Sequence, residues 1–347
     1  MQYFSKKRFI IQRARKKVKQ KTDFFVEMPE KRGRFSQSTK TKEKNMQDLE
    51  IYDCHIHLMP GNTEGPEIFR SKAREAGISG GFIFSMPPGG NLLWEGAEPM
   101  HWKDRIAHVL DFCSKLENFY PFLRLDPTEP DAVEQVEYAK NAGIKGFKVI
   151  CNRYMPVEGL TAYRKMAELD MPLLFHSGIL WDGGEASTNF NRPGNFECML
   201  EVPRLRFALA HVSWPWTDEC IALFGKFANT RLCKKDTPDM YVDSSPGAPD
   251  FYRDEIFRNF VLHRYGIEDR LMFGVDGLAN SYDIRHTKHV IDTDRKMFDR
   301  LQEQYGNYEG YMWEGLEKLS TEDRNPFRKT FRNAVKKNIL EFLNGRQ

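Results

Sequence analysis

The residues best suited to chemistry lie in a short apolar stretch. Residues 51–58 read Ile-Tyr-Asp-Cys-His-Ile-His-Leu, a composition typical of a short buried strand. Because side chains in a strand alternate between its two faces, His55 and His57 are expected to point the same way. Two adjacent imidazoles form half of a metal site. An isolated pair of this kind is more often structural, so the rest of the chain must decide between the two interpretations.

Length and composition indicate one large folded domain. A chain of 347 residues with 40% hydrophobic and 13% aromatic residues can bury a large core, and a single α/β barrel accounts for this length. The six cysteines form no Cys-x-x-Cys pair, which favours reduced thiols in a cytoplasmic protein over a disulfide framework. The sequence has no run of about 18 apolar residues, so we expect no membrane span.

The net charge of +3 hides two regions of opposite sign. Residues 1–45 contain fifteen Lys and Arg against four Asp and Glu, so the remaining residues carry a net charge of −8. We expect residues 1–45 to form a disordered extension without a chemical role. A nucleic-acid or membrane-surface arm and an Arg-rich transit peptide are the alternatives. Met46 is a natural alternative start, and residues 46–347 are predicted to form the barrel domain.

Short apolar runs alternate with longer amphipathic segments from residue 49 onward. The eight strand candidates are residues 51–58, 81–88, 119–127, 143–150, 171–178, 206–212, 240–245 and 271–277. Apolar strands that alternate with helices indicate a parallel sheet covered on both sides. Eight strand–helix units fit a closed (β/α)8 TIM barrel. An open doubly wound sheet is the alternative, but no Gly-x-Gly-x-x-Gly follows the first strand.

Helices are expected between and after these strands. The clearest internal candidates are residues 132–141, 161–169 and 218–227. Asp131 is expected to cap the first of them, and Gly143 to end it. The C-terminal segment is predicted to form additional helices packed on the outside of the barrel. Its apolar stripe consists of Phe327, Phe331, Ile339 and Phe342.

Three further strand candidates end in residues that can bind metal ions. His176 ends the fifth, His211 the sixth and Asp276 the eighth. The first and eighth strands of a closed barrel are neighbours, so Asp276 is expected beside His55 and His57. Imidazoles and a carboxylate suit zinc and similar divalent ions. Such an ion lowers the pKa of a water molecule toward neutrality, and a carboxylate can take that proton and pass it to a leaving group.

This pattern resembles the amidohydrolase superfamily, and specifically its amidohydrolase 2 branch. The resemblance covers the chain from residue 49 to the C-terminal helices and excludes residues 1–45. The motifs that carry it are His55-Ile56-His57, Phe175-His176-Ser177-Gly178, Ala210-His211, Tyr241-Val242-Asp243 and Phe273-Gly274-Val275-Asp276. It implies one divalent metal ion, usually zinc, held by His55, His57, His176 and Asp276. It also implies that His211 is the catalytic, substrate-facing histidine and that Asp276 doubles as a proton shuttle.

Lys148, on the fourth strand candidate, keeps an alternative open. In binuclear relatives a carboxylated lysine from this strand bridges two metal ions. Mononuclear members of the branch carry a similar Gly-x-Lys-Gly-x-Lys run in which the lysine does not bridge metals. We therefore favour one metal ion. Lys148 would then bind a substrate carboxylate or pair with a buried acid. Arg124 can bind an anionic substrate group, although an ion pair with Asp126 is slightly favoured. Asp243 can orient a ligating histidine.

Two further expectations concern residues near the rim. Cys54 lies between two proposed ligands but is expected on the opposite face of its strand, in the core. Arg153 and Arg192 are expected near the rim, where they would join Arg124 and Lys148 in favouring a carboxylated substrate.

These observations predict a metal-dependent hydrolase that acts on a small amide, lactone or ester. The main enzymatic alternative is a non-oxidative decarboxylase or hydratase of a small carboxylic acid. The resemblance implies this alternative, because the amidohydrolase 2 branch also contains such enzymes with the same metal ligands. We expect a small-molecule substrate, a homodimer and no membrane partner. A nucleic-acid-binding protein led by the basic arm ranks last, because it leaves the five rim residues unexplained.

Overall fold

The computed structural model describes residues 46–89, 100–181, 186–306 and 325–346. The predicted disordered extension, residues 1–45, lies outside these ranges. Among the helices within them, none is long and apolar enough to cross a membrane. All six cysteines lie in the described ranges and are free thiols, as their spacing predicts.

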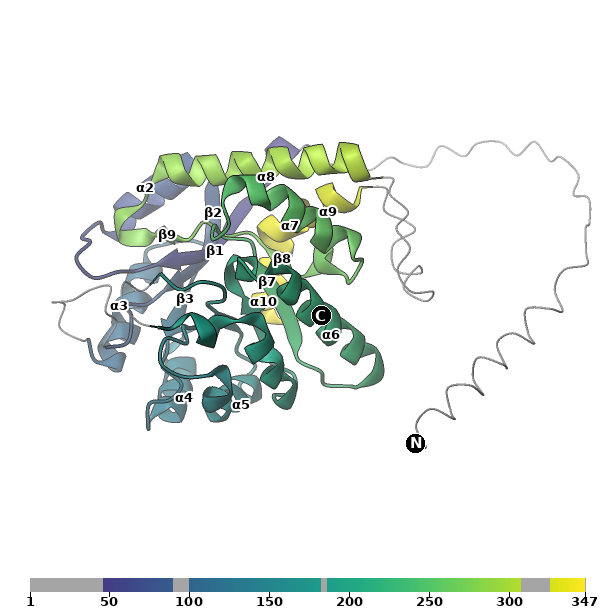
Figure 1. The fold of residues 1–347 in the computed structure, drawn as a ribbon. Helices are drawn as coiled ribbons and strands as arrows, with labels where there is room; N and C mark the ends of the chain where they lie inside the picture. The colour runs from purple at the N-terminus through teal and green to yellow at the C-terminus, as the bar shows by residue number, and fades with distance from the viewer. Residues whose placement is uncertain (1–45, 90–99, 182–185, 307–324, 347) are drawn as a thin grey trace, which may run out of the picture. The chain divides into compact units, whose positions relative to one another are not determined.

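In the described ranges, nine short strands form one parallel sheet in the order β8-β7-β6-β5-β4-β3-β2-β1-β9 (Figure 1). The strands are β1 (Ile51–His57), β2 (Ile78–Phe84), β3 (Phe119–Arg124), β4 (Gly146–Val149), β5 (Leu173–Phe175), β6 (Arg206–Leu209), β7 (Asp239–Asp243), β8 (Leu271–Met272) and β9 (Gly277–Leu278). The last two are parts of the predicted eighth strand, since β8 pairs with β7 and β9 pairs with β1. The sheet therefore closes on itself, which confirms the predicted (β/α)8 barrel.

Helices follow the strands, and all but the last of them cover the outside of the sheet (Figure 1). They are α2 (Pro66–Ala76), α3 (Trp102–Ser114), α4 (Ala132–Ala142), α5 (Leu160–Glu168), α6 (Thr217–Cys233), α7 (Asp250–Leu262), α8 (Ile284–Tyr305), α9 (Pro326–Arg332) and α10 (Asn338–Asn344). Gly143 ends α4 in the left-handed conformation, at φ 108°, as predicted. Asp131 occupies the N-cap position as predicted, but its carboxylate accepts hydrogen bonds from the side chains of Trp102 and Gln135 and makes no capping hydrogen bond to the helix backbone.

The first strand contains a bulge beside the two histidines. The register of β1 against β2 slips by one residue between Asp53 and Ile56. The extra residue allows both Cys54 and His55 to face the barrel interior. Cys54 belongs to the inner cluster that contains Phe84, and the ring of His55 packs on that same phenylalanine. Cys54 is a buried core residue as predicted, but the expectation that it faces away from His55 is wrong.

The eighth strand is interrupted at the rim of the barrel. Between β8 and β9 the chain leaves regular pairing, and Asp276 has a left-handed backbone with φ 57°. Two hydrogen bonds cross the gap to β1. Cys54 N donates to Phe273 O over 2.9 Å, and Val275 N donates to the carboxylate of Asp53 over 3.0 Å. Asp276 therefore lies in a strained turn held by β1, not at the end of a regular strand.

Helix α10 closes the amino-terminal end of the barrel. Ile339 and Phe342 belong to the cluster inside the barrel, and the Phe342 ring centre lies 5.1 Å from that of Tyr241. Arg206, the first residue of β6, donates a hydrogen bond of 2.9 Å to the carbonyl of Phe342. The prediction that this helix packs outside the barrel is therefore wrong. The open end would otherwise expose the apolar interior to water, and α10 covers it.

The rest of the predicted C-terminal stripe packs outside the sheet, as expected. Phe327 and Phe331 of α9 are buried in the outer core cluster, and the Phe331 ring lies 5.5 Å from that of Phe298 on α8. A short π-helix, Asn333–Lys337, joins α9 to α10. Within it, the carbonyl of Ala334 accepts a hydrogen bond of 3.0 Å from Phe273 N, so the tail also supports the interrupted eighth strand.

Removing the Phe342 ring should destabilise the fold without touching the rim. We expect Phe342→Ala to lower the free energy of unfolding by about 3–5 kcal/mol, because it leaves a cavity among buried side chains. Urea denaturation measures this change. Phe251→Ala is the matched control, since that ring is 77% exposed, and it should change stability by less than about 0.5 kcal/mol. Equal losses of stability in the two variants would contradict the conclusion that α10 covers the apolar end of the barrel.

Candidate metal centre

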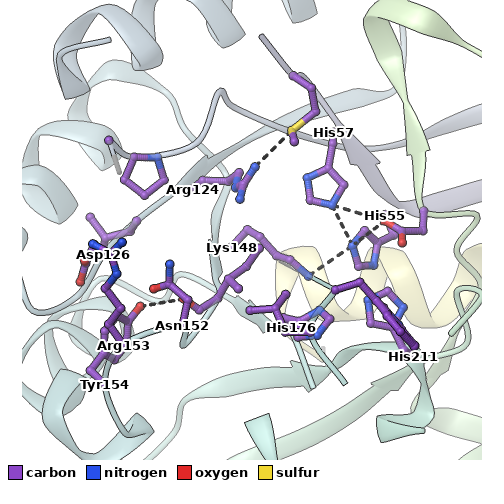
Figure 2. Close-up of a pocket in the computed structure, with 18 of the residues that line it drawn as sticks. His55, His57, Arg124, Asp126, Lys148, Asn152, Arg153, Tyr154, His176 and His211 are labelled. Atoms are coloured by element: carbon purple, nitrogen blue, oxygen red, sulfur yellow. Dashed lines mark hydrogen bonds and ion pairs between the residues drawn. The ribbon is translucent and has the colours of Figure 1, made fainter. Parts of the chain in front are cut away.

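A pocket of about 460 Å³ opens where the barrel strands end (Figure 2). Its lining includes all five residues predicted for the rim: His55, His57, His176, His211 and Asp276. They come from segments spread over more than two hundred positions of the chain, and barrel closure brings them together. The volume is that of a site for a small molecule.

His55, His57 and Asp276 form a tight group in this pocket. The two Nε2 atoms lie 3.1 Å apart, and each lies 3.4 Å from Asp276 Oδ1. In the described part of the chain, this is the one cluster of three or more side chains spaced as metal ligands. Atoms held roughly 2.0–2.2 Å from one ion in a tetrahedral site lie about 3.3 Å apart. The donor types and their spacing therefore fit a divalent metal ion.

The charges within the group suit ligation. Burial lowers the pKa of His57 to about 3, so its imidazole is neutral at pH 7. Partial desolvation opposes ionisation of Asp276, but its electrostatic interaction with His55 and its hydrogen bond with His57 outweigh this effect and hold the pKa of Asp276 well below its usual value. The Asp276 side chain is 38% exposed, and it borders the pocket. The pocket thus presents a neutral imidazole and an anionic carboxylate to a cation.

Asp243, at the end of β7, supports His55 from behind. His55 Nδ1 lies 2.5 Å from Asp243 Oδ2, and both side chains are buried. Burial opposes ionisation of Asp243, but its interactions with His55 lower the pKa of Asp243 to about 2. The carboxylate accepts the Nδ1 proton and leaves the Nε2 lone pair of His55 for a metal ion. The geometry matches the supporting role predicted for Asp243. No described residue gives His57 Nδ1 a hydrogen bond.

His176 lies beside the group but is not part of it. Its Nε2 is 3.2 Å from the carbonyl oxygen of Ile179, and its ring centre is 4.9 Å from that of His211. Burial, with a smaller contribution from His211, lowers the pKa of His176 well below the usual value, so the ring is neutral. Its predicted role as a ligand would require Nε2 to exchange the Ile179 carbonyl for the metal ion, and it stays a prediction.

His211 is held in a strained segment after β6. His211, Val212 and Ser213 are consecutive residues with positive φ, at 59°, 45° and 57°. Such conformations are unfavourable for side chains with a Cβ and cluster at functional sites. A Cβ on Gly247 would come within 2.6 Å of His211 Cβ, so the close approach requires glycine there. Burial lowers the pKa of His211 to about 4, and the ring is neutral at pH 7.

Two buried cations border the same pocket. Arg124 and Lys148 are register partners on β3 and β4. Lys148 Nζ lies 3.3 Å from His55 Nε2, and burial lowers the pKa of Lys148 to about 7. Arg124 is 4% exposed, and burial together with the charge of Arg105 lowers its pKa to about 10, so it remains charged at pH 7. Neither basic side chain has an ion-pair partner in the described ranges, and burial of such groups opposes folding, which points to a role in binding.

The ion pair expected between Arg124 and Asp126 does not form. Arg124 Nη1 instead donates to the thioether of Met59 over 3.3 Å (Figure 2). Asp126 lies in the turn after β3, where its carboxylate accepts hydrogen bonds from the backbone and hydroxyl of Thr128. Among the other basic residues, Arg153 lines the pocket as expected. Arg192 is not among its lining residues and pairs with Glu219 at 2.8 Å.

The sequence analysis did not predict some of the residues at the pocket. Asn152 and Tyr154 line the wall opposite the histidines, and no motif marks them. Ser245 contacts two of the histidines, with Oγ 3.1 Å from His55 Nδ1 and 3.0 Å from His211 Nδ1. One signal could have found it, because Ser245 follows Asp243 by two positions and residues at that spacing share a face of a strand.

Comparison with known proteins identifies the family of this chain. The family model described as Amidohydrolase matches residues 52–306. An amidohydrolase from Burkholderia multivorans, solved with bound HEPES, is 11% identical with a TM-score of 0.48, over 74% of this chain and 93% of that one. A 7,8-dihydropteroate synthase from Vibrio fischeri ES114 is 11% identical with a TM-score of 0.38, over 78% and 98%. No curated protein matches the sequence. Because the family model matches more than half of the chain and includes all five rim residues, the chain belongs to the amidohydrolase family.

Proposed function

We propose that this protein is a metal-dependent hydrolase that cleaves a small amide, lactone or ester. The observation that carries the proposal is the convergence of His55, His57 and Asp276 in a pocket of small-molecule size, in a chain of the amidohydrolase family. These three residues would hold one divalent ion, zinc by the resemblance, with His176 as the proposed fourth ligand. When bound, such an ion lowers the pKa of a water molecule and polarises an oxygen of the substrate.

Asp276 is assigned proton transfer, and His211 is assigned the hydrogen bond to the substrate. Asp276 is ionised at neutral pH and borders the pocket, so its carboxylate can take a proton from the attacking water and pass it to the leaving group. His211 faces the same space from the other side of His55, with the two ring centres 4.9 Å apart. Its neutral imidazole can hydrogen-bond the electrophilic group of the substrate.

Arg124 and Lys148 favour a substrate that carries a carboxylate. Both are buried at the pocket wall, and neither forms an ion pair with any residue in the described ranges. Their nearest polar contacts are a thioether for Arg124 and an imidazole for Lys148. An anionic group on the substrate would supply the missing countercharge, and charge-assisted hydrogen bonds of this kind are strong.

Lys148 also favours the second candidate, a non-oxidative decarboxylase or hydratase. Its Nζ lies 3.3 Å from His55 Nε2, so a carboxylate held by Lys148 would lie next to the proposed metal ion. Two assays separate the candidates. The first follows hydrolysis of a panel of lactones and esters by pH-stat titration and of a panel of amides by the amine they release, and the second measures carbon dioxide release from a panel of small aromatic and unsaturated acids. Turnover in the first assay supports hydrolysis, and carbon dioxide release without it supports decarboxylation.

Substitution of a proposed ligand should remove both the metal ion and activity, whereas substitution of the proposed catalytic histidine should remove activity alone. A chelator should abolish activity and zinc should restore it, with about one metal ion per chain by inductively coupled plasma mass spectrometry. His57→Ala and His176→Ala should lose both metal and activity. His211→Ala should keep the metal and lose turnover, since that residue is assigned to the substrate.

Other outcomes of this metal analysis are equally informative. About two ions per chain would overturn the mononuclear assignment and favour a carboxylated Lys148 that bridges them. Metal loss in His211→Ala would exchange the roles of His211 and His176. Full metal content in His176→Ala would leave His55, His57 and Asp276 as the protein ligands.

The anionic group on the substrate can be tested through Arg124. Arg124→Met should raise KM for carboxylated substrates by about 10- to 100-fold, the value of one or two charge-assisted hydrogen bonds. The same variant should leave KM nearly unchanged for the matching carboxamides. Arg192→Met is the control, because Arg192 pairs with Glu219 and is not among the pocket-lining residues. An equal rise in KM for acids and amides would contradict carboxylate recognition by Arg124.

Burial of Lys148 should make stability depend on pH in a defined direction. Its pKa falls from 10.5 to about 7 on folding, so between these values the unfolded chain binds a proton that the folded chain does not. The stability of the metal-free protein should therefore rise with pH across this window. Lys148→Met should be more stable than the wild type at pH 6 and lose that advantage by pH 10, as measured by urea denaturation. An advantage independent of pH would argue against a buried, depressed lysine.

A further inference from the structure

The hydroxyl of Ser245 bridges the metal group and the proposed catalytic histidine. Ser245 is fully buried, two residues beyond the end of β7. Its Oγ lies 3.1 Å from His55 Nδ1 and 3.0 Å from His211 Nδ1. These two ring nitrogens are its hydrogen-bond contacts among the described residues. A hydroxyl has one proton, so only one of the two nitrogens can receive it.

The partners of His55 decide which nitrogen accepts. Asp243 Oδ2 lies 2.5 Å from His55 Nδ1, while Asp243 Oδ1 accepts the backbone N–H of Ser245 over 2.6 Å. A carboxylate only accepts, so His55 Nδ1 carries a proton and donates it to Asp243. That nitrogen then has no lone pair for the hydroxyl. His211 Nδ1 is then the one acceptor left for the buried Ser245 proton among the described residues, because a protonated Nδ1 there would leave that proton without a hydrogen bond.

We propose that Ser245 is a positioning residue that holds His211 in the tautomer with its proton on Nε2. If Nδ1 accepts a hydrogen bond, the single proton of a neutral imidazole must lie on Nε2. Nε2 of His211 has no partner in the described ranges and is left for a molecule in the pocket that His211 lines. His211 thus presents a hydrogen-bond donor to the substrate, not a lone pair. It polarises an electrophilic oxygen and does not act as the base.

The surrounding side chains fix Ser245 in place. Arg253 of α7 donates to the carbonyl of Ser244 over 3.0 Å and forms a buried ion pair of 2.6 Å with Asp294 of α8. On the other side, a Cβ on Gly274 would come within 3.1 Å of Ser245 Cβ, so the glycine leaves room for the serine. The hydrogen bond to Ser244 and the close packing at Ser245 Cβ therefore restrict where the hydroxyl can lie, as is expected of a residue that orients a catalytic group.

Nitrogen-15 NMR of histidine rings tests the tautomer directly. Long-range correlation spectra would be recorded at pH 8 on full-length protein labelled at histidine, metal-free and with zinc, and His211 assigned by its loss in His211→Gln. We expect an unprotonated Nδ1 and a protonated Nε2 in both samples. Ser245→Ala should give a mixture of tautomers and lower kcat about tenfold, with unchanged KM and metal content. Ser187→Ala is the control, because this buried hydroxyl has no hydrogen-bond partner in the described ranges.

Two results would overturn the proposal: a protonated Nδ1 on His211 in the wild type, or an unchanged His211 spectrum in Ser245→Ala. The wild-type spectrum decides even if that variant fails to fold. The donor role of His211 rests on the proposed hydrolase function, but its tautomer does not depend on metal. Absence of zinc binding would therefore defeat the proposed function while the metal-free spectrum still tests the role of Ser245.

Discussion

The closure of the barrel between its first and eighth strands is the constraint on which the site depends. Neither strand is regular there, since β1 slips by one residue and the eighth strand leaves the sheet between β8 and β9. The Asp53 carboxylate ties the two together, because its Oδ1 accepts the backbone N–H groups of both His55 and Val275. Val275 precedes Asp276 in the chain. The same contact that closes the barrel therefore sets where His55 and Asp276 meet.

Several groups of the site destabilise the folded state. His211 and Asp276 adopt left-handed backbone conformations, which cost of order 1–3 kcal/mol each. Arg124 and Lys148 are buried without an ion-pair partner in the described ranges, which opposes folding further. The apolar layers offset these terms, through the large outer cluster and the inner cluster that α10 covers at the far end. Stability is concentrated away from the rim, and the strained, charged groups are concentrated at it.

The polar groups at the rim form one continuous series of hydrogen bonds. Asp243 accepts from His55 and from the backbone of Ser245, and the Ser245 hydroxyl reaches His211. In the arrangement we propose, one carboxylate makes His55 offer a lone pair on Nε2, and one hydroxyl makes His211 offer a proton on Nε2. Two chemically identical side chains then present opposite functions to the same pocket. The difference comes from the group behind each ring.

The sequence by itself determined the barrel, because its period of apolar strands and amphipathic helices depends only on residue type and spacing. It also determined that His55, His57 and Asp276 would meet, since the first and eighth strands of any closed barrel are neighbours. Only the tertiary structure decided the bulge that turns Cys54 inward, the helix that enters the barrel end, and the contacts of Ser245 with two histidines. Those features depend on the register and packing of segments far apart in the chain, and a pattern of residue types does not encode a slip of one residue.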